Sequence, residues 1–405
     1  MSAELDRSYR ALLSVPSIGR LLIGMQAARI GQSMVSVGIV LFSLTAYHTP
    51  RIAGLTTFFS IFPGIVVSPI AGALLDRHGR IRLIILDYLV ALAALVLMGS
   101  LALASALPSW LLIAIAAVGS LTNPLSGSGV RSIFPLIVPT HLWERVNAVD
   151  STGFVFAAIV GPPLAAGLVA FFGGPVALII IGSTFALAAI VLSGCKEPPA
   201  TTVASDRLLL EAWHGLIYTW RNPTLRGLGF SISVMNIGVG VVNIVLPVLI
   251  LQHLGLSEMV VGLVFAVQGL AGIASAMAFG GVDSRNRERT MLALPMMAIC
   301  TAIALLLIRT TLSMMVIVTM IIGLVQGPLD IALFTVRQRR TDPLWTGRAF
   351  AISMSINFLG YPIGSLMAGM MVSRSMEATL TFGALTCLAA AGLVIAMIPV
   401  NEVHS

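Results

Sequence analysis

The segment GALLDRHGRIR, residues 72–82, lies between two long apolar runs and holds five ionisable residues, although only 10% of the chain is charged. On both sides the sequence is almost entirely apolar, since 58% of the 405 residues are hydrophobic and the mean hydropathy is +1.01. A water-soluble domain does not contain that much apolar surface, so the composition indicates a chain that folds in lipid. The charged segment is then a short loop between two membrane spans.

Outward from this loop, the chain divides into about twelve apolar segments, each close to the ~20 residues that a helix needs to cross a bilayer. The apolar runs lack the alternation that is typical of membrane β-strands. The sequence therefore predicts an all-α integral membrane protein with twelve transmembrane helices. The expected spans, numbered in chain order, are 18–46, 53–75, 83–105, 110–134, 147–171, 175–194, 225–251, 258–281, 290–308, 313–336, 348–372 and 378–399.

The net charge of +7 is distributed unevenly over the loops. Arginine and lysine precede span 1, follow spans 2, 4, 8 and 10, and occupy the centre of the chain, whereas the opposite loops hold only Arg51, Arg309 and Arg374. This asymmetry is the positive-inside rule, and it predicts that both termini and the central loop are cytoplasmic. We expect a multi-pass protein of the bacterial cytoplasmic (inner) membrane, and the basic charge needs no nucleic-acid partner to explain it.

The sequence contains no motif for catalysis, metal binding or nucleotide binding. Cys195, Cys300 and Cys387 are far apart without CxxC spacing, and the six histidines show no paired-ligand arrangement. We expect no enzymatic activity, no metal and no cofactor. The first twenty residues are polar and basic, and the first apolar run is long enough to remain as a span, so we expect no cleaved signal peptide.

The chain also repeats itself at a spacing of about 205 residues. GALLDRHGRIR has a weaker counterpart in GGVDSRNRER at 280–289, and PTHLWERVNAV at 139–149 corresponds to DPLWTGRAFAI at 342–352. Both halves start on the same side, which predicts parallel repeats that form two pseudo-symmetric six-helix bundles. The expected bundles are 1–195 and 223–405. The linker 196–222 contains a short amphipathic helix, which lies at the cytoplasmic membrane surface, packs beneath the bundles, or does both.

These features resemble the major facilitator superfamily. The signature of the loop between its spans 2 and 3, Gly-x-x-x-Asp-Arg/Lys-x-Gly-Arg, is matched by Gly72, Asp76, Arg77, Gly79 and Arg80. EAWHGLIYTWRNPTLR at 211–226 and RQRRTDPLWTGRAFA at 337–351 further resemble the branch that holds siderophore, macrolide and multidrug exporters of bacteria. The resemblance implies the major facilitator fold and transport by alternating access of the two bundles.

The resemblance also implies a role for the charged loop. Asp76 would lie near the N-terminus of span 11 when the carrier faces outward, where a carboxylate stabilises by about 0.3–1 kcal/mol. The loop would then be a conformational latch, with Asp283 and Arg285 as a weaker second copy; the alternative is a charged loop that only sets topology. Gly161 and Pro162 match the Gly-Pro motif of span 5 in proton antiporters, and the alternative is a proline kink without a coupling role.

Polar residues inside the spans are the candidate site residues, because a charge at mid-membrane costs about 2.5–3.5 kcal/mol. In the family, spans 1, 4, 7 and 10 line the central cavity. Arg29, with Gln26 and Gln32 beside it in span 1, is a candidate ligand for an anionic or carbonyl-rich part of the substrate; the alternative is a structural arginine satisfied by helix carbonyls and polar neighbours. Further cavity candidates, which could instead form interhelical hydrogen bonds, are Asn123, Asn236, Asn243, Gln326 and Asn357.

Two intramembrane acids are candidates for proton coupling. Asp330 in span 10 either carries the proton or pairs permanently with an arginine such as Arg337. Asp87 in span 3 is the second candidate, and its alternative is a structural pair with Arg131 of span 4.

We predict a secondary active transporter that exports a small amphipathic compound, drug-like or siderophore-like, in exchange for protons. The alternative is a proton symporter or facilitator for uptake of a small organic anion or other solute, which Arg29 favours. A receptor or lipid-modifying enzyme would need a catalytic constellation that the sequence lacks. The expected partners are the lipid bilayer, a small-molecule substrate and protons, and we expect a monomer.

Overall fold

The computed structural model describes residue 6 and residues 8–195, 208–279, 287–342 and 346–399. This part of the chain is helical and contains no strand. The chain forms two compact units, Met1–Ile39 with Phe59–Asp206 (unit 1) and Val40–Phe58 with Arg207–Ser405 (unit 2).

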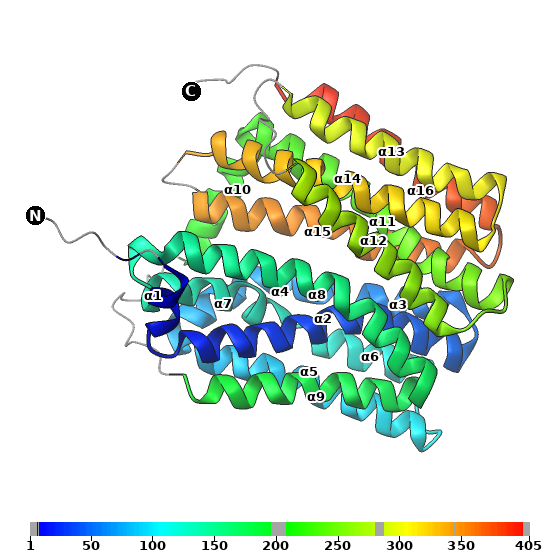
Figure 1. Ribbon diagram of the computed structural model, residues 1–405, viewed down its shortest axis with the longest axis horizontal. Helices are drawn as coiled ribbons and strands as arrows, with labels where there is room; N and C mark the ends of the chain where they lie inside the picture. Colours follow the sequence, from blue (N-terminus) through cyan, green and yellow to red (C-terminus); the bar gives the residue numbers. More distant parts are fainter. Residues whose placement is uncertain (1–5, 7, 196–207, 280–286, 343–345, 400–405) are drawn as a thin grey trace, which may run out of the picture. The chain divides into compact units, whose positions relative to one another are not determined.

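Figure 1 shows the helices in chain order. Unit 1 contains α1 (Tyr9–Ser14), the first part of α2 (Ile18–Tyr47), α4 (Phe62–His78), α5 (Arg80–Leu103), α6 (Ser109–Ser120), α7 (Asn123–Ile137), η1 (Thr140–Leu142), α8 (Trp143–Phe172) and α9 (Gly174–Ser193). Unit 2 contains the end of α2, most of α3 (Pro50–Phe59), α10 (Leu208–Arg221), α11 (Pro223–Val248), η2 (Leu249–His253), α12 (Glu258–Phe279), α13 (Glu288–Ile308), α14 (Leu312–Arg339), α15 (Thr346–Met371) and α16 (Met376–Met397).

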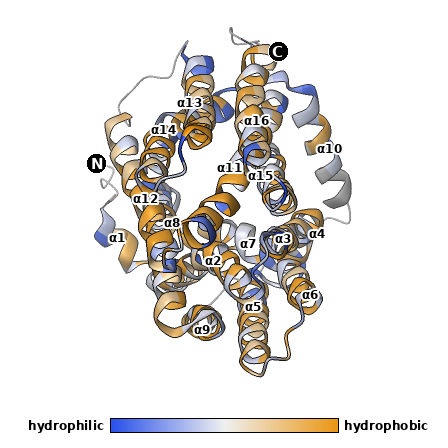
Figure 2. Cartoon of the chain, turned by 90° about the vertical axis from the view of Figure 1, so that its right-hand side faces the viewer, coloured by the Kyte–Doolittle hydropathy of each residue, from blue (hydrophilic) through white to orange (hydrophobic). Residues whose placement is uncertain are grey.

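Eleven helical segments of the described residues are long and apolar enough to cross a membrane, and each overlaps one expected span. The remaining expected span, 348–372, coincides with α15. Apolar residues cover the helices on most sides (Figure 2), and large apolar side chains such as Phe171, Ile190 and Met277 are at least 70% exposed. Helices that are apolar all round belong in a membrane. The predicted all-α membrane fold is confirmed.

Two expected spans are each built from two helices. Span 2 consists of α3 and α4, with a turn at Ser60, and span 4 consists of α6 and α7, with a turn at Leu121. Each turn comes shortly before a proline, Pro63 or Pro124, at the start of the next helix. Proline has no N–H and clashes with the carbonyl four residues earlier, which accounts for the interrupted helix at these two positions.

The same helix pairs pack together in both units. In unit 1, α5 packs against α9 and α7, and α4 packs against α7. In unit 2, α13 packs against α16 and α14, and α12 packs against α14. These pairs join spans 3–6, 3–4 and 2–4 in the first half, and spans 9–12, 9–10 and 8–10 in the second. The repetition of packing confirms the predicted pseudo-symmetric bundles.

The division into units differs from the expected boundaries in one segment. Residues 40–58, which precede the second expected span or begin it, group with residues 207–405. A reason for this is visible between α3 and α15, where a Cβ atom added to Gly54 would lie 2.9 Å from Cα of Gly369. Such close approach of two backbones needs small residues on both helices.

The expected amphipathic helix is α10. It packs against α11 and α15, and Gly215 and Thr219 on that face are buried. Trp213, Leu216 and Trp220 form an apolar stripe that stays exposed, at 57%, 36% and 56%. One face therefore packs on the bundle, and the other remains suited to the membrane surface.

Candidate functional site

The charged loop at 72–82 forms the junction of two helices. Helix α4 ends at His78, α5 begins at Arg80, and Gly79 joins them with a φ of +89°, a conformation that favours glycine. Gly79 therefore forms the tight turn between the two helices, and Arg77 is exposed. The surroundings of Gly72 and the side chain of Asp76 lie outside the described part, as do the residues of the second copy, so the latch stays a prediction.

Arg29, near the middle of α2, is paired with Asp150 on α8. Its Nη2 donates to the Asp150 carboxylate, and its Nη1 donates to the Asp150 backbone carbonyl at 2.7 Å. The two side chains are only 12% and 5% exposed. Gln26, one turn earlier, donates to the carbonyl of Gly153 at 3.0 Å, and the ring centroid of Phe154 lies 5.9 Å from the guanidinium carbon. Gln26 and Arg29 thus connect α2 to three residues of α8.

This pairing bears on the expected role of Arg29. The positive charge of Arg29 is compensated by Asp150 within unit 1. This arrangement agrees better with the structural alternative than with the ligand role, because a substrate could bind Arg29 only if the ion pair opened. Sequence reasoning missed Asp150. The available signal was an acid inside an otherwise apolar expected span, which is costly unless it has a partner.

The Gly-Pro motif of span 5 lies where α8 meets α2. A Cβ atom on Gly161 would collide with the side chain of Ser33 and lie 3.1 Å from the backbone nitrogen of Met34. Pro162 and Pro163 lie inside α8, which continues through them to Phe172. The glycine therefore permits close helix packing, and the helix is not interrupted at the prolines.

A second buried acid lies near Gln32, further along α2. The Gln32 amide nitrogen donates to the hydroxyl of Ser126 at 3.4 Å. The hydroxyls of Ser126 and Thr122, near the carboxylate of Asp87, donate to the backbone carbonyls of Asn123 and Gly119 at 3.4 Å and 3.3 Å. Asp87 is 1% exposed, and its Oδ1 has no hydrogen-bond partner among the described residues. The side chain of Arg131 lies outside the described part, so the expected pair with Asp87 stays a prediction. Asn123, the first residue of α7, is exposed.

The acid of span 10 is bound by a neutral group. Both carboxylate oxygens of Asp330 accept from the amide nitrogen of Gln326, each at 3.0 Å and one helical turn away on α14. The described residues show no ion pair to Asp330. Arg337, its expected alternative partner, instead contacts Asn357 and Met354 on α15.

The asparagines of unit 2 connect α11, α14 and α15. The side-chain amide of Asn236 donates to the backbone carbonyl of Asn357 at 2.8 Å. In the orientation that satisfies its neighbours, the Asn357 amide oxygen accepts from Arg337 Nη2 at 2.7 Å and its nitrogen donates to Ser353. Both asparagines thus form the interhelical hydrogen bonds named as their alternative. Asn243 is buried, and its amide nitrogen has no hydrogen-bond partner in the described part of the chain.

Glu288, at the start of α13, is another residue that sequence reasoning missed. Its carboxylate oxygens lie 3.6 Å from Arg339 Nη1 and 3.6 Å from Arg340 Nη2. Arg340 also donates to the backbone carbonyl of Pro399 at 2.8 Å. This network connects the start of α13 to the ends of α14 and α16. The described residues contain no cluster of three His, Cys, Asp or Glu side chains that could hold a metal ion.

Two units of apolar helices with the same internal packing, each with buried ionisable side chains inside its spans, define a polytopic membrane transporter. The chain belongs to the major facilitator superfamily, whose family model matches residues 21–365 and again residues 228–405. The second match covers the second half of the chain, in agreement with the internal repeat.

Comparison with individual proteins also places the chain among membrane transporters of this superfamily. The chain is 32% identical over 397 residues to the MFS-type transporter y4rN of Sinorhizobium fredii, covering 96% of each chain. It is 23% identical over 337 residues to the multidrug efflux pump Tap of Mycobacterium tuberculosis, covering 78% of each. The crystal structure of the nucleoside transporter NupG shares the fold with a TM-score of 0.72 at 11% identity, covering 94% of this chain and 97% of that one.

Proposed function

We propose that the protein is a secondary active transporter that exports a small amphipathic compound in exchange for protons. The observation that carries the proposal is Asp330, an acid within a membrane span that is bound by the neutral amide of Gln326. An acid in this setting can gain or lose a proton without breaking an ion pair. A carrier needs such a group if proton transfer is to drive substrate movement.

The direction of transport is inferred from sequence relatives. The chain is similar over most of its length to a multidrug efflux pump, and it carries the Gly-Pro motif at Gly161 and Pro162 that resembles proton antiporters. The uptake alternative depended on Arg29 as an anion ligand. Its pairing with Asp150 weakens that argument, because the positive charge is already matched.

The proposed substrate class follows from the character of the helices. Apolar residues make up 58% of the chain, and nineteen of them are methionine, which adapts to ligands of different shape. A compound with an apolar body and a few polar groups suits such a protein. The proposed topology has both termini and the loop around Gly79 in the cytoplasm, as the distribution of arginine predicts.

The test uses everted membrane vesicles energised by respiration, with fluorescent drug-like compounds as substrates. Asp330→Asn is expected to abolish gradient-driven accumulation and to retain counterflow exchange, because the amide keeps the shape of the side chain but cannot release a proton. Glu377→Gln, which neutralises an exposed acid in the first turn of α16, serves as the matched control and should accumulate substrate normally. An Asp330→Asn variant that still concentrates substrate would contradict the assignment.

A further inference from the structure

Helix α10 is a surface helix whose position on unit 2 is fixed by hydrogen bonds. The Tyr218 hydroxyl accepts from the backbone nitrogen of Asp342 at 2.9 Å. Just after the helix, the side-chain amide of Asn222 donates to the backbone carbonyl of Arg340, also at 2.9 Å. Figure 2 shows α10 beside α15, at the outside of this unit. The side chains on the outer face of α10 therefore have a defined orientation.

The outer face of α10 is continuous with the exposed surface of a membrane span. Trp213, Leu216 and Trp220 form the exposed apolar stripe of α10. The ring of Trp220 packs edge-to-face against Phe230 of α11, with the ring centroids 5.7 Å apart. Phe230 is 36% exposed and lies in the segment Pro223–His253, which is long and apolar enough to cross a membrane. The stripe thus continues from the surface helix onto a membrane-spanning helix.

Two arginines lie next to this aromatic pair. Arg221, the last residue of α10, is exposed. Arg226 of α11 is partly exposed, and its Nη1 donates to the backbone carbonyl of Trp220 at 3.4 Å. Arginine has five N–H donors, so Arg226 can bind this carbonyl and a phosphate at the same time. The segment 213–230 contains no Asp or Glu, so its formal charge complements an anionic headgroup.

The order of these groups along α11 matches the order of groups in a phospholipid. Arg226 and Phe230 are four residues apart, so they lie on one face of the helix and about 6 Å apart along its axis. The membrane-spanning segment begins at Pro223, which places Arg226 nearer the membrane surface and Phe230 deeper. Tryptophan is enriched between these two levels, because its ring is apolar and its N–H is polar. A phosphate bound at the arginines thus leaves the acyl chain against Trp220 and Phe230.

We propose that the exposed face of α10 and the start of α11 bind an anionic phospholipid of the leaflet in which α11 begins. Arg221 and Arg226 bind the phosphate, the indole of Trp220 lies at the level of the headgroup, and Phe230 contacts the acyl chain. The rest of the apolar stripe extends the contact along the membrane surface. Lipid binding at this site requires only a membrane-spanning chain, so it is independent of the direction and coupling of transport.

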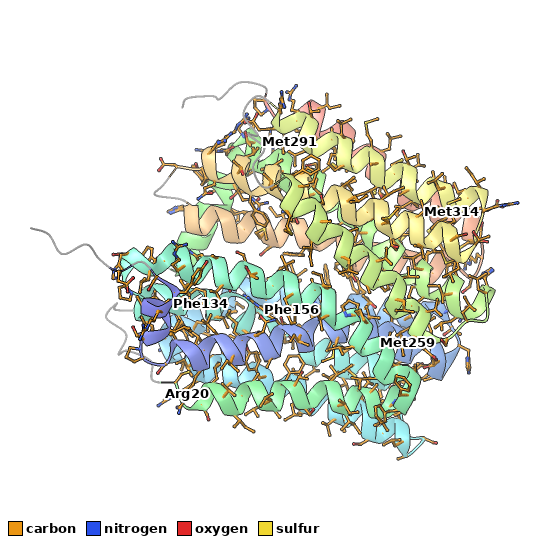
Figure 3. The ribbon with its side chains drawn as sticks, viewed as in Figure 1. Arg20, Phe134, Phe156, Met259, Met291 and Met314 are labelled. Carbon is orange, nitrogen blue, oxygen red and sulfur yellow. The ribbon has the colours of Figure 1, made fainter. Side chains whose placement is uncertain are left out.

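A matched control is available at the opposite end of unit 2. The end of α10 lies near the start of α13, because both regions contact Arg340. Figure 3 shows Met291, near the start of α13, and Met314, near the start of α14, at opposite ends of the unit. Arg309, which follows α13, and Arg374, which follows α15, are exposed at the end of Met314. Their replacement removes the same charge far from the proposed site.

The test measures thermal unfolding of the purified full-length protein in detergent, titrated with phosphatidylglycerol, phosphatidylcholine or inorganic phosphate. A ligand that binds the folded state raises the melting temperature. For the wild type, phosphatidylglycerol should raise the melting temperature more than phosphatidylcholine does, because only phosphatidylglycerol has a net negative charge. Inorganic phosphate should leave the melting temperature unchanged, because it has no acyl chain. Equal responses to the two lipids, or a response to inorganic phosphate equal to that of phosphatidylglycerol, would overturn the proposal.

The variants locate the response on α10 and α11. The double variant Arg221→Gln, Arg226→Gln should raise the half-saturating concentration of phosphatidylglycerol about 25-fold, or about five-fold for each arginine at an anionic membrane surface. The control Arg309→Gln, Arg374→Gln should keep the wild-type response. Arg221→Gln alone changes an exposed side chain and should weaken binding about five-fold, which keeps the proposal testable if the double variant does not fold. Wild-type binding in both of these arginine variants, or an equal loss in the control, would contradict the proposed site.

Discussion

At the residue scale, the ionisable side chains inside the spans differ in how far neighbours in the same unit compensate their charge. Arg29 is bound by Asp150 through side chain and backbone, whereas Asp330 is bound by one amide. The first arrangement fixes two helices to each other, and the second leaves an acid able to change its protonation state. Burial alone therefore does not separate a structural charge from a candidate for proton coupling, whereas the charge of the partner distinguishes these two residues.

The pair of Arg29 and Asp150 gives a testable energetic prediction. Arg29→Gln or Asp150→Asn alone should lower the free energy of unfolding by about 3–5 kcal/mol, because each leaves a buried charge without its partner. The double variant should recover much of that loss, since neither charge remains. Thermal unfolding of the four proteins measures the coupling, and losses that simply add in the double variant would argue against a direct pair.

The sequence could predict some of these relationships and not others. Gln326 and Asp330 are four residues apart, a spacing that places them on one helix face, so this contact was accessible from helix geometry. Arg29 and Asp150 are 121 residues apart, and only the packing of α2 against α8 brings them together. The cost of a charge in an apolar span predicts that a partner exists, but it does not say which one.

At the element scale, the contact between α2 and α8 depends on glycine at one position. Gly161→Ala should destabilise the protein by about 1–3 kcal/mol, because the added Cβ meets Ser33 and the backbone of Met34. Gly167 lies on the same helix with no atom within 4 Å of an added Cβ, so Gly167→Ala should be neutral or slightly stabilising. Melting temperatures of the two variants provide the comparison.

An equal response of the two glycine variants would mean that α8 does not approach α2 as closely as described. Transport by Gly161→Ala gives a second measurement, since a helix contact that must form and separate during the cycle should change the rate as well as the stability.

The ends of the helices were predicted within a few residues, because the length of an apolar run is a local property. The breaks in spans 2 and 4 were not predicted, although Pro63 and Pro124 were visible in the sequence. Prolines are tolerated in membrane helices, and α8 continues through Pro162 and Pro163. Whether a helix breaks at a proline or continues through it depends on the residues packed against it, and tertiary packing determines which residues these are.

At the scale of the whole molecule, the chain is a duplicated bundle of the major facilitator superfamily. The repeat was recognisable from two pairs of loop segments, and the packing of corresponding helices confirms it. The assignment of residues 40–58 to the second unit was not predictable, because it depends on the contact of Gly54 with Gly369. Sequence patterns identify which segments cross the membrane, while contacts decide how they group.

The most direct test of the account uses the purified protein reconstituted into lipid vesicles, with an imposed pH gradient as the only energy source and a fluorescent amphipathic drug as substrate. The account predicts uphill accumulation of the drug on the acidic side, without nucleotide, and its collapse when a protonophore is added. Accumulation that requires nucleotide, or that persists after the protonophore has removed the gradient, would contradict it.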